Sequence, residues 1–148
     1  MASMTKQSIP VVVAGALGKM GSEVIKTVVA SADCELIGAI DTALDKEGSD
    51  VGELLGIESL DVPITSDFES SLCSASQLNR NEGSKEGNAP ILVDFTHPSV
   101  VYEHTRTAIA YGVHPVIGTT GLDSNQLTDL NIFAEKASIG SAVIPNFS

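Results

Sequence analysis

The fold is decided by the stretch Ile9–Gly21, which reads IPVVVAGALGKMG. Its apolar first half predicts a buried β-strand, and the residues from Lys19 onward predict a helix with apolar residues at helical spacing on one face. The three glycines suit a dinucleotide site, because they allow a tight turn, a close approach of the backbone to a pyrophosphate, and close helix–strand packing. The pyrophosphate would bind free N–H groups at the helix N-terminus, where the helix dipole favours negative charge.

A carboxylate supports this interpretation, since Asp41 follows the last of these glycines by twenty residues, where a dinucleotide site needs a partner for the ribose. The glycine spacing is G-x-x-G-x-x-G rather than the commoner G-x-G-x-x-G, so an ordinary glycine-rich turn remains the alternative. Lys19, inside the turn, could contact a phosphate directly or be a solvated helix lysine.

Composition limits the class of protein. The chain has 148 residues, enough for one domain, and its 43% hydrophobic and 18% charged residues are typical of a globular protein. No apolar run approaches the roughly 20 residues of a membrane span. A net charge of −11 argues against nucleic acid and anionic membranes as partners. Cys34 and Cys73 lack metal-ligand spacing, so we expect no metal site, free thiols and a cytoplasmic location, or the plastid stroma in a plant.

Strand and helix patterns alternate along the chain and predict an α/β fold: a Rossmann-like, doubly wound parallel sheet with helices on both faces. Residues 1–8 are expected to be a disordered tail and residues 9–148 a dinucleotide-binding domain. Residues 75–90 are polar and contain glycines, which predicts a mobile surface loop, with a regulatory or partner-binding segment as the alternative. Strands are expected at 9–14, 34–40, 62–65, 91–95, 113–118 and 139–144, and helices at 19–31, 51–55, 66–74, 98–111 and 123–136.

Ligands of such sheets bind beyond the carboxyl ends of the strands. In the turn 94–98, Thr96 can present its hydroxyl to a ligand and Phe95 can form a wall, although Thr96 or His97 can equally cap the next helix. The turn 118–121, Gly-Thr-Thr-Gly, can direct backbone N–H groups at an amide or an anion. The three histidines form no ligand set, and we expect structural or solvent-facing roles for His104 and His114.

These turns together resemble the dihydrodipicolinate reductase family, from about residue 9 to residue 148, with Gly-Thr-Thr-Gly and the final Asn-Phe-Ser as the most specific parts. The resemblance implies that the glycine turn holds the pyrophosphate, that Asp41 faces the adenosine ribose, and that the later turns reach the nicotinamide. The cofactor-binding residues it implies are Gly15, Leu17, Gly18, Lys19, Met20, Gly21, Asp41, Phe95, Thr96, Gly118, Thr119, Thr120, Asn146 and Phe147, with Thr120 and Gly121 at the substrate edge.

Two departures from the family pattern bear on the cofactor. His97 stands where members often have arginine, and Thr42 follows the ribose carboxylate where some members have an arginine for a 2′-phosphate. The family commonly accepts both NADH and NADPH, so both remain candidates. Lys46 or Lys19 could offset the negative charge of Asp41 in place of the missing arginine.

The resemblance also implies a second domain after Ser148 that binds the cyclic dicarboxylate substrate, supplies the proton-donating groups and assembles a homotetramer. We therefore expect no catalytic residue in this chain, cofactor binding without turnover, and an active NAD(P)H-dependent oxidoreductase of lysine biosynthesis only with that domain. The alternative is a stand-alone nucleotide-binding or sensing module without catalysis.

Overall fold

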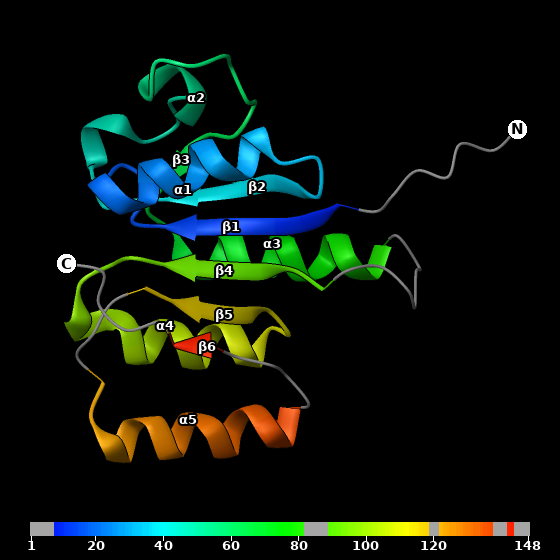
Figure 1. Cartoon of the computed structure of the whole chain (residues 1–148), viewed down its shortest axis with the longest axis vertical. Coiled ribbons are helices and arrows are strands. Elements are labelled where there is room, and N and C mark those ends of the chain that lie inside the picture. Colours follow the sequence, from blue (N-terminus) through cyan, green and yellow to red (C-terminus); the bar gives the residue numbers. More distant parts are fainter. Residues whose placement is uncertain (1–7, 82–88, 119–121, 138–141, 144–148) are drawn as a thin grey trace, which may run out of the picture.

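The computed structural model describes residues 8–81, 89–118, 122–137 and 142–143. Within these ranges six strands form one sheet in the order β3-β2-β1-β4-β5-β6, and every neighbouring pair is parallel, so all the arrows of Figure 1 point the same way. The predicted parallel sheet is confirmed. The strands are β1 (Ile9–Ala14), β2 (Cys34–Ile40), β3 (Ile64–Thr65), β4 (Ile91–Asp94), β5 (His114–Ile117) and β6 (Ala142–Val143).

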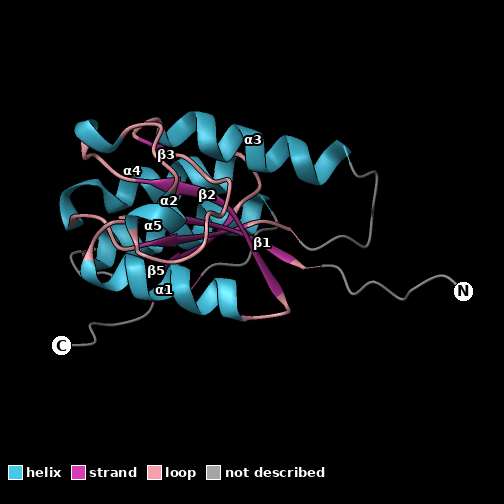
Figure 2. Ribbon diagram, turned by 90° about the horizontal axis from the view of Figure 1, so that it is seen from above, coloured by secondary structure: helices cyan, strands magenta, loops and turns pink. Residues whose placement is uncertain are grey.

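Helices cover both faces of the sheet. Successive residues of the central strand point to opposite faces, so the apolar side chains on each face need a helix to bury them. Val11 and Val13 of β1 pack in one apolar cluster with Ile25 of α1, while Val12 packs in a second cluster with Leu72 of α3. Figure 2 shows the strands lying between α1 on one side and α3 on the other. The helices are α1 (Lys19–Ala30), a 3-10 turn η1 (Leu44–Lys46), α2 (Val51–Leu54), α3 (Phe68–Asn81), α4 (Pro98–Ala110) and α5 (Ser124–Ala137).

The loop predicted for residues 75–90 is wrong in its first part, because α3 continues to Asn81. Asp67 caps the helix, its Oδ1 accepting the N–H of Ser70, and the buried side chains of Leu72 and Ala75 hold it on the sheet. The polar residues that suggested a loop belong to a helix with only one apolar face. Residues 82–88 of the predicted loop, and residues 1–7 of the predicted tail, lie outside the described residues.

The strand register places four turns side by side at one edge of the sheet. Ala14 of β1 pairs with Ile40 of β2 and with Asp94 of β4, and Asp94 pairs with Ile117 of β5. The residues that follow, Asp41, Gly15, Phe95 and Gly118, therefore start four adjacent turns at the carboxyl ends of the strands. Strand β1 is the point from which the chain winds outward in both directions, which is where a doubly wound sheet opens a crevice.

No helix of the described ranges has the length and apolar character needed to cross a membrane.

Candidate functional site

The turn after β1 is shaped so that only glycine fits at two positions. Gly15 has φ +81°, and a Cβ there would lie 3.0 Å from the carbonyl carbon of Phe95. A Cβ on Gly21, in the first turn of α1, would lie 1.9 Å from the carbonyl oxygen of Gly15. The first glycine thus permits the turn and the third permits close helix–strand packing, as the sequence predicts.

The N-terminus of α1 is open to an anion. Gly18 is the N-cap, so no side chain satisfies the N–H groups of the first turn, and this turn contains no acidic residue. A Cβ on Gly18 would come 3.3 Å from the carbonyl oxygen of Gly15, which makes the turn tight on its inner side. Backbone N–H groups and the positive end of the helix dipole are together the features that bind phosphate groups.

Asp41, at the end of β2, is fixed beside this turn by its own carboxylate. Its Oδ2 accepts the N–H of Leu17 at 2.9 Å, and its Oδ1 accepts the N–H of Ala43 at 3.1 Å. Each carboxylate oxygen can accept more than one hydrogen bond, so the group still has acceptor capacity for a ligand hydroxyl. The carboxylate is therefore held in place by two main-chain donors, one from the glycine turn and one from the β2 turn.

A cavity of about 290 Å³ opens beside these turns. It brings together three of the predicted residues, Gly15 and Asp41 with Thr96 from the turn after β4. A crevice between the turns of β2 and β4 is where a doubly wound sheet holds the adenosine end of a dinucleotide. The other lining residues are Ile40, Thr42, Ser66, Phe68, His97, Val100 and His104.

The cavity has a buried polar network that the sequence analysis missed. Asp94 is fully buried at the end of β4, and its carboxylate accepts hydrogen bonds from the N–H and the hydroxyl of Thr96. Nδ1 of His104, on α4, lies 3.1 Å from Oδ2 of Asp94 and 3.2 Å from Oγ1 of Thr96. The His104 ring stacks on Phe68 with centroids 3.8 Å apart. The structural or solvent-facing role expected of His104 stays a prediction; the structure adds that the histidine pairs with a buried carboxylate and lines the cavity.

A sequence signal for this network existed. Asp94 is the one charged residue of an otherwise apolar strand, ILVD, and a charged group at a buried position needs a partner. Its partner lies ten residues away on the following helix, a separation that no short motif marks.

The two polar side chains of the turn after β4, Thr96 and His97, have different hydrogen-bond partners. His97 caps α4, its Nδ1 accepting the N–H of Ser99 at 3.1 Å, which confirms one of the two predicted capping residues. The hydroxyl of Thr96 donates to Oδ1 of Asp94. Phe95 contacts the neighbouring turns, as a Cβ on Gly118 would lie 2.0 Å from its ring.

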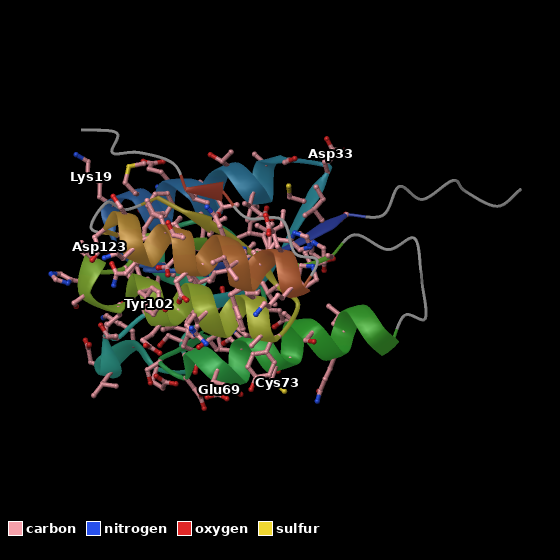
Figure 3. All side chains as sticks on the ribbon, turned by 90° about the horizontal axis from the view of Figure 1, so that it is seen from below. Lys19, Asp33, Glu69, Cys73, Tyr102 and Asp123 are labelled. Atoms are coloured by element: carbon pink, nitrogen blue, oxygen red, sulfur yellow. The ribbon has the colours of Figure 1, made fainter. Side chains whose placement is uncertain are left out.

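Other predicted site residues are not brought to the cavity. Lys19 and Met20 are exposed, and Figure 3 shows Lys19 projecting from the end of the molecule. Leu17 contributes its N–H to Asp41 and its side chain to the core. Five predicted residues lie outside the described residues: Thr119, Thr120, Gly121, Asn146 and Phe147. Among the described residues, no group of three or more His, Cys, Asp or Glu side chains is arranged to hold a metal ion.

Comparison with known proteins identifies the family. The family model described as dihydrodipicolinate reductase, N-terminus, matches residues 9–147. The chain belongs to the dihydrodipicolinate reductase family. A 4-hydroxy-tetrahydrodipicolinate reductase of Parasynechococcus marenigrum is 69% identical over 141 residues, which are 95% of this chain and 50% of that protein. One from Prochlorococcus marinus is 62% identical over 146 residues, 99% of this chain and 51% of that protein. The chain thus spans about half the length of these relatives.

Solved structures agree with this assignment. The dipicolinate-bound dihydrodipicolinate reductase of Paenisporosarcina is 31% identical, with a TM-score of 0.72 over 94% of this chain and 48% of that protein. The WlbA dehydrogenase of Thermus thermophilus, solved with NAD and UDP-GlcNAcA, has a TM-score of 0.70 at 12% identity, over 92% of this chain and 41% of that protein. At that identity the second likeness concerns the fold alone, which is the Rossmann-type fold of nicotinamide-dependent dehydrogenases.

Proposed function

We propose that this chain is the nicotinamide-cofactor domain of a 4-hydroxy-tetrahydrodipicolinate reductase. The observation that carries the proposal is the row of turns at the carboxyl edge of the sheet. It sets an uncapped helix N-terminus for the pyrophosphate beside a fixed carboxylate, Asp41, for the adenosine ribose. Asp41 lines one cavity together with Gly15, which begins the turn that leads into that helix, and the close approaches at Gly15 and Gly21 leave the inner side of the turn free of side chains. These residues fit a dinucleotide.

The proposed reaction is the reduction of hydroxytetrahydrodipicolinate to tetrahydrodipicolinate in the diaminopimelate route to lysine. Relatives at 62% and 69% identity that carry the reductase name support it, as does the solved reductase with dipicolinate bound. The cofactor supplies the hydride when bound, while this chain binds and orients it. We propose a small cyclic dicarboxylate as the substrate. The relatives are about twice as long as this chain, and we place the groups that bind and protonate the substrate in their other half.

Both NADH and NADPH are proposed as cofactors, with the charge at Asp41 favouring free ribose hydroxyls over a 2′-phosphate. The first basic residue after Asp41 in the sequence is Lys46, in the segment that follows β2. Its Nζ lies 3.7 Å from the carboxylate of Asp45. A 2′-phosphate would therefore have to compete with an acidic side chain for that ammonium group.

The remaining parts of the proposal rest on the resemblance. They are contacts of Phe95 and Gly118–Thr120 with the nicotinamide side, closure of that pocket by Asn146 and Phe147, and a substrate edge at Thr120 and Gly121. Assembly as a homotetramer, through the second domain, belongs to the same proposal. A cytoplasmic location fits the two free cysteines, Cys34 and Cys73.

Two measurements test the proposal. Titration calorimetry with NADH and NADPH should detect binding to the 148-residue chain, and Gly18→Val should abolish it while the circular dichroism spectrum stays unchanged, because a branched side chain would occupy the space of the pyrophosphate. The matched control is Gly38→Val, in β2, where the three atoms nearest to an added Cβ all belong to the side chain of Val12.

The second measurement concerns the reaction. This chain alone should not oxidise NADPH in the presence of enzymatically generated substrate, whereas a fusion to the second half of the Parasynechococcus relative should. Binding without activity of the fusion would favour the alternative of a nucleotide-binding module without catalysis. Failure of both cofactors to bind would overturn the proposal.

A further inference from the structure

The buried carboxylate of Asp94 fixes the protonation pattern of His104. A carboxylate can only accept hydrogen bonds, and Oδ2 of Asp94 lies 3.1 Å from Nδ1 of His104, so Nδ1 carries a proton. Oδ1 of Asp94 is already engaged by the N–H and the hydroxyl of Thr96. In the neutral imidazole the second ring nitrogen, Nε2, is then an acceptor.

That second nitrogen is available to a ligand. Among the described residues no hydrogen-bond partner of Nε2 is found, and no buried side-chain nitrogen or oxygen there lacks a partner, so Nε2 is not sealed in the core. The side chain of His104 is 19% exposed and lines the cavity that also contains Asp41. The imidazole therefore has one edge held by the protein and the other open to that cavity.

The walls around His104 suit a flat, aromatic ligand. The imidazole stacks on the ring of Phe68 at an interplanar angle of 11°, so that two parallel aromatic rings, one from α3 and one from α4, line the cavity. Val100, which is 39% exposed, adds an apolar surface. An aromatic and apolar lining with one directed polar atom suits a heteroaromatic base, since its faces pack on apolar side chains while its edge forms hydrogen bonds.

We propose that Asp94 positions His104 so that Nε2 accepts a hydrogen bond from the exocyclic amine of the cofactor's adenine. This inference rests on the proposed function, because it assigns the base of the dinucleotide to the cavity that Asp41 borders. His104 contacts the ligand, and Asp94 is a positioning residue that acts through it. The buried charge of Asp94, costly on its own, thus selects one imidazole tautomer for recognition.

The experiment compares NADH with its reduced hypoxanthine analogue, in which the amine of the base is replaced by a carbonyl oxygen. An acceptor at Nε2 would meet a donor in NADH and another acceptor in the analogue. Calorimetry on the 148-residue chain should show that NADH binds about tenfold more tightly than the analogue. That is the effect of one hydrogen bond, which forms with NADH and cannot form with the analogue. His104→Phe, which keeps a flat ring against Phe68, should bring the two affinities to within about twofold of each other.

Asp94→Asn should also lower the ratio, since it removes the charge that holds the proton on Nδ1 while keeping the size of the side chain. His114→Phe is the matched control, because His114 begins β5 at the opposite edge of the sheet, and it should leave the ratio unchanged. If His104 had only a structural role, the His104→Phe variant would bind both ligands more weakly by the same factor, and the ratio of the two affinities would not change.

The outcomes separate this inference from the proposed function. Equal affinity of the wild-type chain for the two dinucleotides would overturn the inference while leaving the cofactor domain in place, and that measurement needs no variant to fold. Tighter binding of the hypoxanthine analogue would overturn it too, since Nε2 would then be a donor. Binding of neither dinucleotide would instead reject the proposed function.

Discussion

The ring of Phe95 lies against the main chain of Gly118, so that a Cβ added to Gly118 would stand 2.0 Å from Cε1 of Phe95. The backbone of the same Phe95 lies against Gly15, where a Cβ would come 3.0 Å from its carbonyl carbon and oxygen. Phe95 thus links the turn after β1 with the turn after β5. Because both neighbours are glycines, one aromatic residue can fill the space between two turns that are proposed to meet the same cofactor.

We expect Gly118→Ala to lower the free energy of unfolding by about 1–3 kcal/mol, the usual cost of overpacking a filled position. The Phe95 ring would have to leave its place, because Cε1, Cδ1 and Cζ all lie within 2.6 Å of the new methyl group. Adding Phe95→Leu should recover part of the loss, since the shorter side chain leaves room for the methyl group. Urea denaturation of the wild type, both single variants and the double variant measures this coupling. Strictly additive losses would show that the ring and Gly118 do not interact.

A second prediction separates the roles of two glycines in one turn. Gly21→Ala should destabilise the fold severely, because its Cβ would lie 1.9 Å from the backbone oxygen of Gly15, which has no flexible side chain to move away. Gly18→Ala should be tolerated far better, since its nearest neighbour would be 3.3 Å away and its φ of −74° suits any residue. Thermal denaturation followed by circular dichroism tests the order, and equal melting temperatures of the two variants would refute it.

The parts of the fold that sequence predicts well are those that local patterns determine. The apolar run before Gly15, the helix from Lys19 and the strand ending before Asp41 all follow from periodicity and glycine chemistry, and the structure confirms each. Their adjacency follows too, since parallel strands end at one edge. The end of α3 did not follow, because its last turns, to Asn81, carry few apolar residues of their own and continue a helix already packed on the sheet.

The missed part of the site depends on contacts between elements. Asp94 and His104 belong to a strand and to the next helix, and only the packing of α4 on the sheet brings Nδ1 of the histidine to the carboxylate. The partner of the Thr96 hydroxyl depends on such a contact too, because the hydroxyl donates to the buried carboxylate two residues before it. Local sequence indicates a polar turn here, but not which groups satisfy one another.

The pH dependence of stability is expected to reflect Asp50, the N-cap of α2. Desolvation raises the pKa of this carboxyl. Hydrogen bonds from the N–H groups of Leu60, Glu53 and Val62 together lower the pKa by more than desolvation raises it, so the pKa lies below the ordinary value of 3.8. A lowered pKa in the folded state gives stability that is present above pH 3.8 and is lost as the pH falls through the folded pKa.

Asp50→Asn should therefore be less stable than the wild type near pH 7, and the difference should shrink below about pH 3.8 as the wild-type carboxylate is protonated. Urea denaturation at several pH values measures it. Asp45→Asn is the matched control, because Asp45 is a largely exposed acid whose contact is the Nζ of Lys46. A difference that stays constant with pH would mean that the charge of Asp50 does not matter.

The last prediction concerns the choice between NADH and NADPH at Asp41. If its carboxylate accepts hydrogen bonds from the ribose hydroxyls, Asp41→Ala should weaken NADH binding by about 1.5–3 kcal/mol, the value of a hydrogen bond to a charged group. NADPH should lose less or gain, because the variant also removes a repulsion between the carboxylate and the 2′-phosphate. Calorimetry with both cofactors gives the two changes.

Asp41→Asn serves as the comparison, because the amide oxygen can still accept a backbone N–H from Leu17 or Ala43 while the charge is gone. If charge decides, Asn and Ala should shift the NADPH-to-NADH affinity ratio in the same direction, and only Ala should also lower the melting temperature markedly. Equal weakening of both cofactors in both variants would mean that Asp41 supports the glycine turn through Leu17 without contacting the ribose.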